Sequence, residues 1–321
     1  MNKIKATLAA LTMIIASPTW AQSYPSKPVR IIIPGAAGAP PDILSRAMGP
    51  AMSQALGQAW VVENRVGANG IIGMEAVVRS NPDGYTLSIT QGAPVSLNPY
   101  FYTKLPYEPL KDLAPIANMG VIAASILVSA ATPVNSMREL VDMAKAKPET
   151  LLWSTWGPGS FSDLYRAWTE SYFNVRFQEL PYKASSAAFQ SVIAGEGQVM
   201  LNASGALPSL AKAGKIKVLA TIGPTRYRTL PEVPSFAELG YDMDFRGWVG
   251  AFAPTGTSRD IVQRLNTEIN KVLADSAFGE KFLVPASVEF KAGTPEEFGK
   301  FLKVDRELAA RLTKLAKVKP E

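Results

Sequence analysis

The sequence predicts an α/β protein of two domains, and three observations support this fold class. Short apolar runs alternate with segments of helical periodicity along the chain, as they do in βαβ units. The 321 residues are 47% hydrophobic and 19% charged, enough to bury a sizeable core and more than one domain usually holds. A strand, a loop of small residues and a helix also follow one another twice, at 29–56 and at 151–173. We therefore expect each domain to contain a mostly parallel sheet flanked by helices.

Eight short segments are predicted as strands, because each is an apolar run that stands between turn or helix signals. In chain order they are Val29–Ile33, Val61–Glu63, Tyr85–Thr90, Ser125–Ser129, Leu151–Thr155, Val199–Asn202, Lys217–Ile222 and Val249–Ala253.

The helices between these strands have recognisable starts and faces. Ser136 and Thr294 each stand three residues before a glutamate, the pattern of a capping box, and Pro295 takes the first helical position after Thr294. A helix is predicted from Asp42 to Leu56, and Gly49-Pro50 is expected to kink or break it, because proline removes a backbone hydrogen bond. One apolar helix face is expected to pack on a sheet, formed by Ile261, Val262, Leu265, Ile269, Val272 and Leu273.

The first 21 residues have the features of a secretory signal peptide. Lys3 and Lys5 form a charged start, 6–16 is an apolar run, and Thr19-Trp20-Ala21 is a small-x-small cleavage site. The apolar run is shorter than the roughly 18 residues that span a bilayer, and no later window reaches that length. These features predict export to the periplasm, cleavage after Ala21 and a soluble mature chain that begins at Gln22.

The composition excludes several classes of active site. The chain has no cysteine and no histidine, which excludes disulfides, thiol nucleophiles, Ser/His and Cys/His pairs, and zinc sites built on imidazole or thiolate. Its formal charge is +6, and loss of Lys3 and Lys5 with the signal lowers this to +4. No basic block interleaved with aromatics appears, so we expect either a small anionic ligand or a charge that only aids solubility, and no nucleic acid.

The first strand leads into a loop that is suited to binding an anion. In the run from Gly35 to Ala39 almost no side chains stand in the way, so backbone N–H groups can approach a ligand closely. The helix that begins near Asp42 adds the positive end of its dipole. Asp42 itself is first of all a partner of that dipole, with a general base as the alternative interpretation.

A second segment repeats this plan. The strand Leu151–Thr155 runs into Trp156-Gly157-Pro158-Gly159-Ser160 and then into a helical segment, Phe161–Phe173. Ligands of open α/β sheets bind beyond the carboxyl ends of the strands, so two such loops on two domains would face one cleft. That arrangement suits a ligand with two anionic ends, or one end held from both sides.

Three further motifs are interpreted as structural. Gly157-x-Gly159 lacks the third glycine of a dinucleotide fingerprint, and Gly67, Gly70 and Gly73 are interpreted as a surface turn that opens no helix. Ser209-x-x-Lys212 matches a nucleophile-plus-base pattern, but the motifs that complete such a site are absent.

Two side chains near the second loop are candidates for the cleft. Trp156 stands where it would wall the cleft rather than fill the core. Lys183 would supply a positive charge, with a solvated lysine as the default interpretation.

Short motifs along the mature chain carry a family resemblance. They are Tyr24-Pro25-Ser26-Lys27-Pro28, Val62-Glu63-Asn64-Arg65, Pro82-Asp83-Gly84-Tyr85-Thr86-Leu87, Leu105-Pro106-Tyr107, Pro181-Tyr182-Lys183, Ala206-Leu207-Pro208 and Leu230-Pro231-Glu232-Val233-Pro234. With them the chain resembles the extracytoplasmic substrate-binding proteins of tripartite tricarboxylate transporters, the Bug (Bordetella uptake gene) receptors.

This resemblance implies a fold and a binding mode. The fold is a two-domain clamshell like the type II periplasmic binding proteins, with crossovers near Gly120–Ala124 and Phe245–Trp248. Domain 1 is then 22–122 with 248–321, and domain 2 is 123–247. A carboxylate is held between the domains by the two loops, through backbone amides, hydroxyls and water, and a hinge motion buries it.

Both loops depart from the family pattern. The first commonly reads Pro-Phe-Pro-x-Gly-Gly-x-x-Asp, and here Gly35, Ala36 and Ala39 replace the aromatic, the second proline and the second glycine. In the second loop Asp163 stands in place of a histidine, which should disfavour some anions. The space at Gly35 and the rings of Trp156 and Phe161 suggest a larger or aromatic carboxylate.

We therefore predict a periplasmic solute-binding protein, a monomer without catalysis or cofactor, that delivers an organic carboxylate to membrane transporter subunits. The alternatives are a sensor subunit that presents its ligand to a signalling receptor and a hydrolase that uses Ser209 and Lys212. The predicted ligand-binding residues are Gly35, Ala36, Ala37, Gly38, Ala39, Asp42, Thr90, Gln91, Trp156, Gly157, Gly159, Ser160, Phe161, Ser162, Asp163, Lys183, Asn202 and Ser204.

Overall fold

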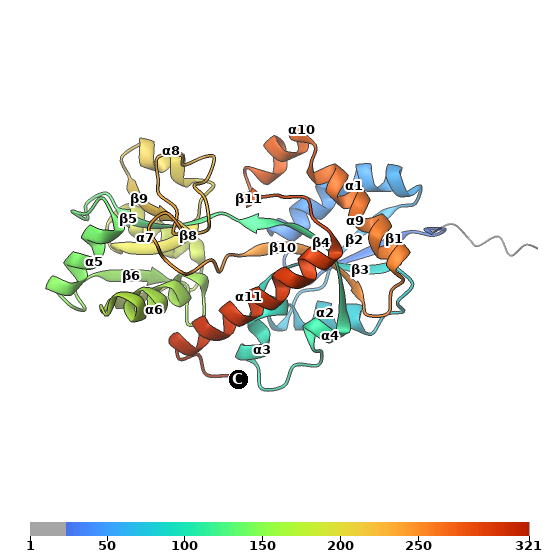
Figure 1. Cartoon of the computed structure of the whole chain (residues 1–321), viewed down its shortest axis with the longest axis horizontal. Helices are drawn as coiled ribbons and strands as arrows, with labels where there is room; N and C mark the ends of the chain where they lie inside the picture. The colour runs from blue at the N-terminus through green and yellow to red at the C-terminus, as the bar shows by residue number, and fades with distance from the viewer. Residues whose placement is uncertain (1–23, 321) are drawn as a thin grey trace, which may run out of the picture.

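The computed structural model describes residues 24–320 and divides them between two sheets (Figure 1). We call the six-stranded sheet with its helices the first lobe, and the five-stranded sheet with its helices the second lobe. The first lobe contains β1 (Val29–Ile33), α1 (Pro40–Leu56), β2 (Trp60–Asn64), η1 (Ala68–Gly70), α2 (Ile71–Val78), β3 (Thr86–Gln91), η2 (Ala93–Leu97), α3 (Asn98–Phe101), α4 (Pro109–Asp112), β4 (Leu113–Ile122), β10 (Trp248–Pro254), α9 (Arg259–Leu273), α10 (Ser276–Phe278), η3 (Gly279–Leu283), β11 (Val288–Glu289) and α11 (Pro295–Leu315). The second lobe contains β5 (Ala124–Ser129), α5 (Met137–Ala146), β6 (Leu152–Thr155), α6 (Phe161–Phe173), β7 (Gln178–Pro181), α7 (Ser185–Ala194), β8 (Val199–Ala203), α8 (Leu207–Lys212) and β9 (Ile216–Thr221).

The predicted α/β class of two sheets flanked by helices is confirmed, with one difference in strand direction. The strand orders are β11-β4-β10-β3-β1-β2 and β7-β6-β8-β5-β9. β1 is parallel to β2 and β3, and β6 is parallel to β7 and β8, but β10 and β5 are antiparallel to both of their neighbours. Both sheets are therefore mixed rather than mostly parallel. β4 carries the chain toward the second lobe and β10 brings it back, so these two strands must run in opposite directions.

All eight predicted strands lie at observed strands, with ends that differ by at most one residue. β4, β7 and β11 are not predicted from the sequence. β4 contains Pro115, which pairs with Phe252 beside a register shift, so the proline stands at an irregularity of the ladder. β7 is a polar edge strand that ends at Pro181, and β11 has two residues, so neither produces an apolar run.

Helix α1 runs without interruption from Pro40 to Leu56, so of the kink or break expected at Gly49-Pro50 the break is wrong. Pro50 faces solvent, whereas the buried face of the helix, which includes Met48 and Met52, packs into the core of the first lobe. Packing of that face outweighs the loss of one backbone hydrogen bond.

The predicted capping boxes form to different degrees. At Thr294 both reciprocal hydrogen bonds with Glu297 are present, 3.1 and 2.8 Å long, and Pro295 occupies the first turn. Ser136 accepts the N–H of Glu139, but the carboxylate of Glu139 turns to the N–H of Asn135 instead. The second site is therefore half of a capping box.

The predicted face of α9 packs as expected. Val262, Leu265, Ile269 and Leu273 are buried in the core of the first lobe, with Ile261 and Val272 at its border.

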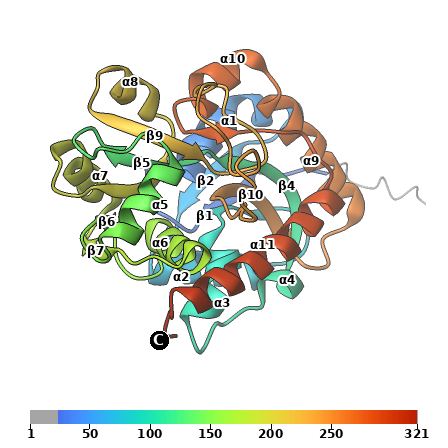
Figure 2. The ribbon, with the colours of Figure 1, turned by 60° about the vertical axis from the view of Figure 1, so that its left-hand side comes forward.

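Helix α11 lies along both lobes (Figures 1 and 2). Phe298 and Leu302 pack in a cluster with Trp248 of the first lobe, whereas Ala309 and Leu312 belong to the main core cluster of the second lobe. The chain passes from the first sheet to the second at Ala123 and returns along 222–247. The residue boundaries of the two domains remain a prediction.

The predicted signal peptide lies outside the described residues. Within residues 24–320, no helix is both long and apolar enough to cross a membrane.

Candidate ligand-binding site

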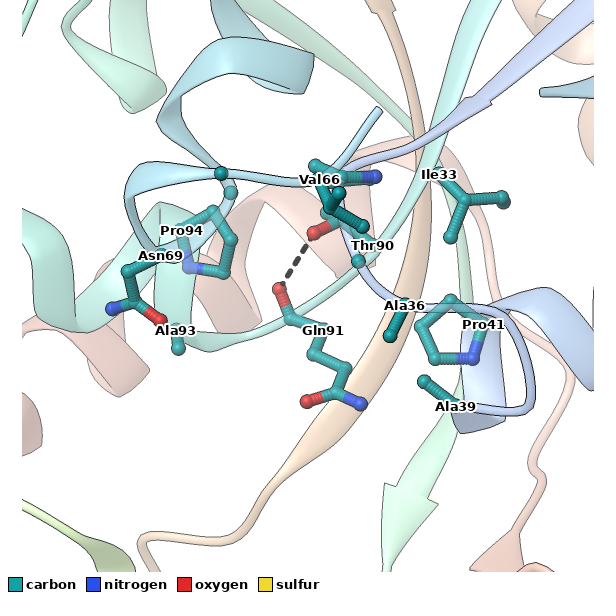
Figure 3. Close-up of a pocket in the computed structure, with 14 residues that line it drawn as sticks. Ile33, Ala36, Ala39, Pro41, Val66, Asn69, Thr90, Gln91, Ala93 and Pro94 are labelled. Atoms are coloured by element: carbon teal, nitrogen blue, oxygen red, sulfur yellow. Dashed lines mark hydrogen bonds between the residues drawn. The ribbon is translucent and has the colours of Figure 1, made fainter. Parts of the chain in front are cut away.

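A cavity of about 380 Å³ opens at the carboxyl ends of β1, β2 and β3 (Figure 3). Every residue that lines it comes from the first lobe, and none of them is ionisable. The lining consists of Ile33, Pro34, Gly35, Ala36, Ala39, Pro41, Val66, Gly67, Asn69, Gly70, Thr90, Gln91, Ala93 and Pro94. Five of the predicted site residues are among these, namely Gly35, Ala36, Ala39, Thr90 and Gln91.

Asp42 holds the first loop in place through hydrogen bonds. The buried carboxylate accepts the backbone N–H of Gly38 through Oδ2 at 2.9 Å and the Arg46 guanidinium through Oδ1 at 2.9 Å. Arg46 also donates to Asn64, whose amide in turn donates to the carbonyl of Gly35. Burial alone would raise the pKa of Asp42, but the bonds from Gly38 and Arg46 hold it below its usual value. Asp42 is therefore an ionised support of the loop, and its charge is already paired.

The exposed hydrogen-bond donors of the first loop are backbone groups. Among the described residues, the N–H groups of Gly35, Ala36 and Ala37 donate no hydrogen bond. Pro40 and Pro41 occupy the first turn of α1, so the helix itself contributes few free N–H groups and acts mainly through its dipole. Ala37 and Gly38 are exposed on the outer part of the loop and do not line the cavity.

Gln91 supplies a side-chain amide to the cavity. In Figure 3 its side chain extends between Ala93 on one side and Ala36 and Ala39 on the other. No hydrogen-bond partner is found for its side-chain amide among the described residues, whereas the buried hydroxyl of Thr90 donates to the carbonyl of Gln91 at 3.1 Å. Gln91 is therefore free to bind a ligand.

The segment after β2 is the part of the site that the sequence interpretation missed. Gly67 and Gly70 have φ values of +130° and +87°, and they lead into η1 and then α2, so the glycine-rich segment does open a helix. A Cβ atom at Gly70 would stand 2.8 Å from Cγ of Pro94 and 2.9 Å from the carbonyl oxygen of Pro34. The glycine spacing was the available signal, because it marks backbone that approaches other backbone closely.

The second loop contains the same support as the first. The buried carboxylate of Asp163 accepts the N–H of Gly159 through Oδ2 at 2.9 Å and the Arg166 guanidinium through Oδ1 at 2.6 Å. Gly159 has φ +74°, close to the +83° of Gly38 in the first loop. In both lobes, then, a glycine N–H is bound by an aspartate four residues later that also pairs with an arginine.

Arg166 is surrounded by carboxylates. Besides Asp163 it lies 3.2 Å from Glu170 and 3.7 Å from Glu179. Burial alone would lower the pKa of Arg166, but the hydrogen bond to Asp163 and the nearby carboxylates raise it above its usual value. Glu179 also accepts the hydroxyl of Thr155 at 2.8 Å, which ties the end of β6 to this cluster.

Two aromatic side chains near the second loop pack against other residues. Phe161 stacks on Phe245 with ring centroids 5.2 Å apart and planes 9° apart. Trp156 is half-buried against the apolar cluster that includes Leu127 and Met200. Ser160 caps α6, because its hydroxyl accepts the N–H of Asp163.

Four other predicted site residues of the second lobe differ in their exposure to solvent. The hydroxyl of Ser162 is buried and bonded to Trp153, to the carbonyl of Ser154 and to the N–H of Leu201, so it supports α6 from inside. Ser204 is buried and bonded to Ser125. Lys183 is exposed and Asn202 is half-exposed. No predicted residue of the second lobe, Gly157 and Phe161 included, lines the cavity of the first lobe.

Comparison with known families gives this geometry a context. A model described as "Tripartite tricarboxylate transporter family receptor" matches residues 44–316. The chain belongs to this receptor family. The resemblance inferred from the sequence motifs is thereby confirmed.

Relatives of this receptor match along nearly their whole length. A UPF0065 protein of Bordetella bronchiseptica is 31% identical over 98% of this chain and 93% of its own. Protein BugT of Bordetella pertussis is 29% identical over 90% of this chain and 89% of its own. The structure of an R. palustris protein solved with adipate has a TM-score of 0.76 at 26% identity, covering 93% of this chain and 100% of its own.

The alternative hydrolase site is not supported by the receptor's structure. The Ser209 hydroxyl donates to the carbonyl of Ala206 one turn earlier at 2.9 Å, and no hydrogen bond joins it to Lys212 among the described contacts. The family is one of receptors rather than enzymes.

The sequence predicts that Asp163 disfavours some anions, but the charge of its carboxylate is already paired within the protein. Its carboxylate is directed into its own loop and paired with Arg166, so the negative charge is compensated where it lies. Gly35, by contrast, keeps the space expected from loss of an aromatic, because nothing lies within 4 Å of the position that its Cβ would take.

Proposed function

We propose that this protein is a periplasmic solute-binding receptor that captures an organic carboxylate between its lobes and delivers it to a tripartite tricarboxylate-type transporter, without catalysis. Family membership supports the transport role, and the relative solved with adipate supports a carboxylate ligand.

The observation that carries this proposal is the uncharged cavity with free donors. Gly35 and Ala36, whose N–H groups have no hydrogen-bond partner among the described residues, line this cavity together with Gln91, and no carboxylate is among its lining residues. Neutral donors of this kind bind an anion well when they are fixed beforehand, because little has to be reorganised on binding. Asp42 and Arg46 provide that fixation from behind the loop.

We further propose a larger or aromatic carboxylate as the ligand. The open space at Gly35 and the apolar walls formed by Ile33, Val66 and Pro94 favour an apolar body behind the carboxylate. Trp156, half-buried on the second loop, would cover that body from the other lobe.

The proposal also covers the mature form of the protein and its domain boundaries. We propose that the chain is exported, cleaved after Ala21 and active as a monomer from Gln22 onward. The two domains are proposed to be 22–122 with 248–321, and 123–247.

Tryptophan fluorescence titration and calorimetry of the mature protein test the proposal. We expect saturable binding of carboxylates without turnover, and binding of aromatic acids at least as tight as that of citrate or succinate. Gln91→Leu should weaken binding about tenfold, the loss of a hydrogen bond to a charged group, whereas Gln263→Leu on the exposed face of α9 should leave it unchanged. Tighter binding of citrate or succinate than of any aromatic acid contradicts the ligand class, and equal effects of both variants contradict the site.

A further inference from the structure

The second loop contacts the first lobe directly. Gly159 of the second loop lies against the ring of Phe101, which is the last residue of α3 in the first lobe. A Cβ atom at Gly159 would stand 2.7 Å from Cζ of this ring and 3.2 Å from Cε1. The ring therefore lies against the backbone of the loop, and a side chain at position 159 would require the ring to move and would adopt an unfavourable φ of +74°.

Phe101 is fixed to the cavity on its own side. Asn98, three residues earlier, is buried and exchanges two hydrogen bonds with Asn69, 2.6 and 3.1 Å long. Asn69 lines the cavity. The neighbouring Tyr100 donates through its hydroxyl to the carbonyl of Arg306, and in both ribbon views α3 lies beside α11 (Figures 1 and 2). The helix that carries the ring is thus tied to the cavity wall, while the ring itself packs against the core cluster of the second lobe.

Gly159 is equally fixed on the side of the second lobe. Its N–H is bound by Asp163, and the hydroxyl of Ser160 caps the helix that follows. Because both sides of the contact are held by hydrogen bonds within their own lobes, the contact limits how closely the second loop approaches the cavity, together with the packing of α11 against both lobes.

We propose that Phe101 is a spacer residue that sets the distance between the two binding loops and thereby the length of carboxylate that they hold together. This inference rests on the proposed function and adds a specificity-determining residue to it. A smaller side chain at this position lets the second loop approach the cavity, and shorter ligands then reach both loops.

Calorimetry of the mature chain with unbranched dicarboxylates from succinate to sebacate tests the spacer. We expect the length of the tightest-binding acid to fall in Phe101→Ala, with the affinity ratio of short to long acids changing about tenfold, and to fall less in Phe101→Leu, which keeps more of the packing. An unchanged preference in folded Phe101→Leu and Phe101→Ala overturns the proposal.

Glycine variants of the second loop supply a matched control. Gly159→Ala combines an unfavourable φ of +74° with the clash against Phe101, whereas Gly157→Ala has an unfavourable φ of +105° and open space. Gly159→Ala should weaken binding at least tenfold more than Gly157→Ala, and Phe101→Ala should restore part of that loss in the double variant. Equal losses in the two glycine variants, or no restoration, contradict the contact as the cause.

A distance measurement separates failure of the spacer from failure of the proposed function. The chain has no cysteine, so Gln54→Cys on α1 and Lys145→Cys on α5, both exposed, can carry spin labels without further changes. The spacer predicts a shifted or broadened distance between the lobes in Phe101→Ala even without ligand. If no carboxylate binds the wild-type protein, the proposed function fails. An unchanged distance distribution rejects the spacer independently.

Discussion

Asp305→Asn is expected to make the protein more stable at neutral pH, although it removes a buried hydrogen-bonded charge. Asp305 lies on α11, where its carboxylate accepts the hydroxyl of Ser96 and the indole N–H of Trp248 through the same oxygen, Oδ2. No cation pairs with it among the described residues. Burial, opposed by these two hydrogen bonds and reinforced by the charge of Asp244, raises the pKa of Asp305 to about 6.

The size and sign of the effect follow from this pKa. An ordinary aspartate titrates near 3.8, so the native state holds the proton about two pH units longer than the unfolded state does. The stability that this proton provides is fully present below about pH 4 and is lost as the pH rises through about 6. At about 1.4 kcal/mol for each unit, the free energy of unfolding falls by roughly 3 kcal/mol across this range. The amide introduced by Asp305→Asn does not titrate, and its oxygen can accept the same two hydrogen bonds.

Urea unfolding followed by tryptophan fluorescence, at intervals from pH 4 to pH 8, measures the effect. Subtracting the wild-type free energy from that of Asp305→Asn cancels the titration of all other groups that the variant leaves alone. The difference should grow in favour of the variant by up to roughly 3 kcal/mol between pH 4 and pH 7. A difference that stays constant with pH would refute the reasoning, whatever its sign, because it would show that Asp305 does not titrate in this range.

Three further outcomes are expected. Asp42→Asn leaves one acceptor oxygen where the carboxylate uses two, one for the Gly38 N–H and one for Arg46, and it removes the charge that pairs with Arg46. Carboxylate affinity measured by calorimetry should therefore fall about tenfold. The accompanying loss of about 1–3 kcal/mol in unfolding free energy should be seen at neutral pH and vanish as the pH falls through the lowered pKa of Asp42. Gly70→Ala should lower the unfolding free energy by about 2 kcal/mol or more and weaken binding, because the added Cβ would meet Pro94 and Pro34. The control, Gly57→Ala, has a φ of +68° but open space, so it should lower the unfolding free energy by about 1 kcal/mol and leave binding unchanged. Thr294→Ala breaks the capping box and should lower stability by about 1 kcal/mol in thermal unfolding, without a change in affinity.

Much of the fold could be predicted because the patterns involved are local. The strand Val29–Ile33 and the helix Phe161–Phe173 were predicted with the observed ends, since apolar periodicity and a capping serine mark them in the sequence itself. β4 could not be predicted in this way. Its Pro115 and Gly120 weaken the local strand pattern, and only pairing with β10 and β11 holds it in the sheet.

Part of the candidate site could likewise be predicted from local patterns, and part of it could not. Small residues after a strand marked both loops, and Gln91 was selected at the end of a strand. Asn69 and Gly70 were missed because their part in the cavity depends on contact with Pro34 and Pro94, which lie elsewhere in the chain. Ser162 was selected for its place after a loop, yet its side chain points into the core.

The sequence by itself determined the family, the α/β class and the two loops, because motifs, apolar periodicity and small-residue runs are properties of neighbouring residues. Only the tertiary structure decided what the charged groups of those loops do. The sequence predicts Asp42 as a partner of the helix dipole and Asp163 as a charge that disfavours some anions, whereas in the structure each binds a glycine N–H and an arginine. The contact of Phe101 with Gly159 likewise joins residues far apart in the chain and in different lobes. The direction of a side chain and a contact between lobes depend on packing over long sequence distances, which no local pattern records.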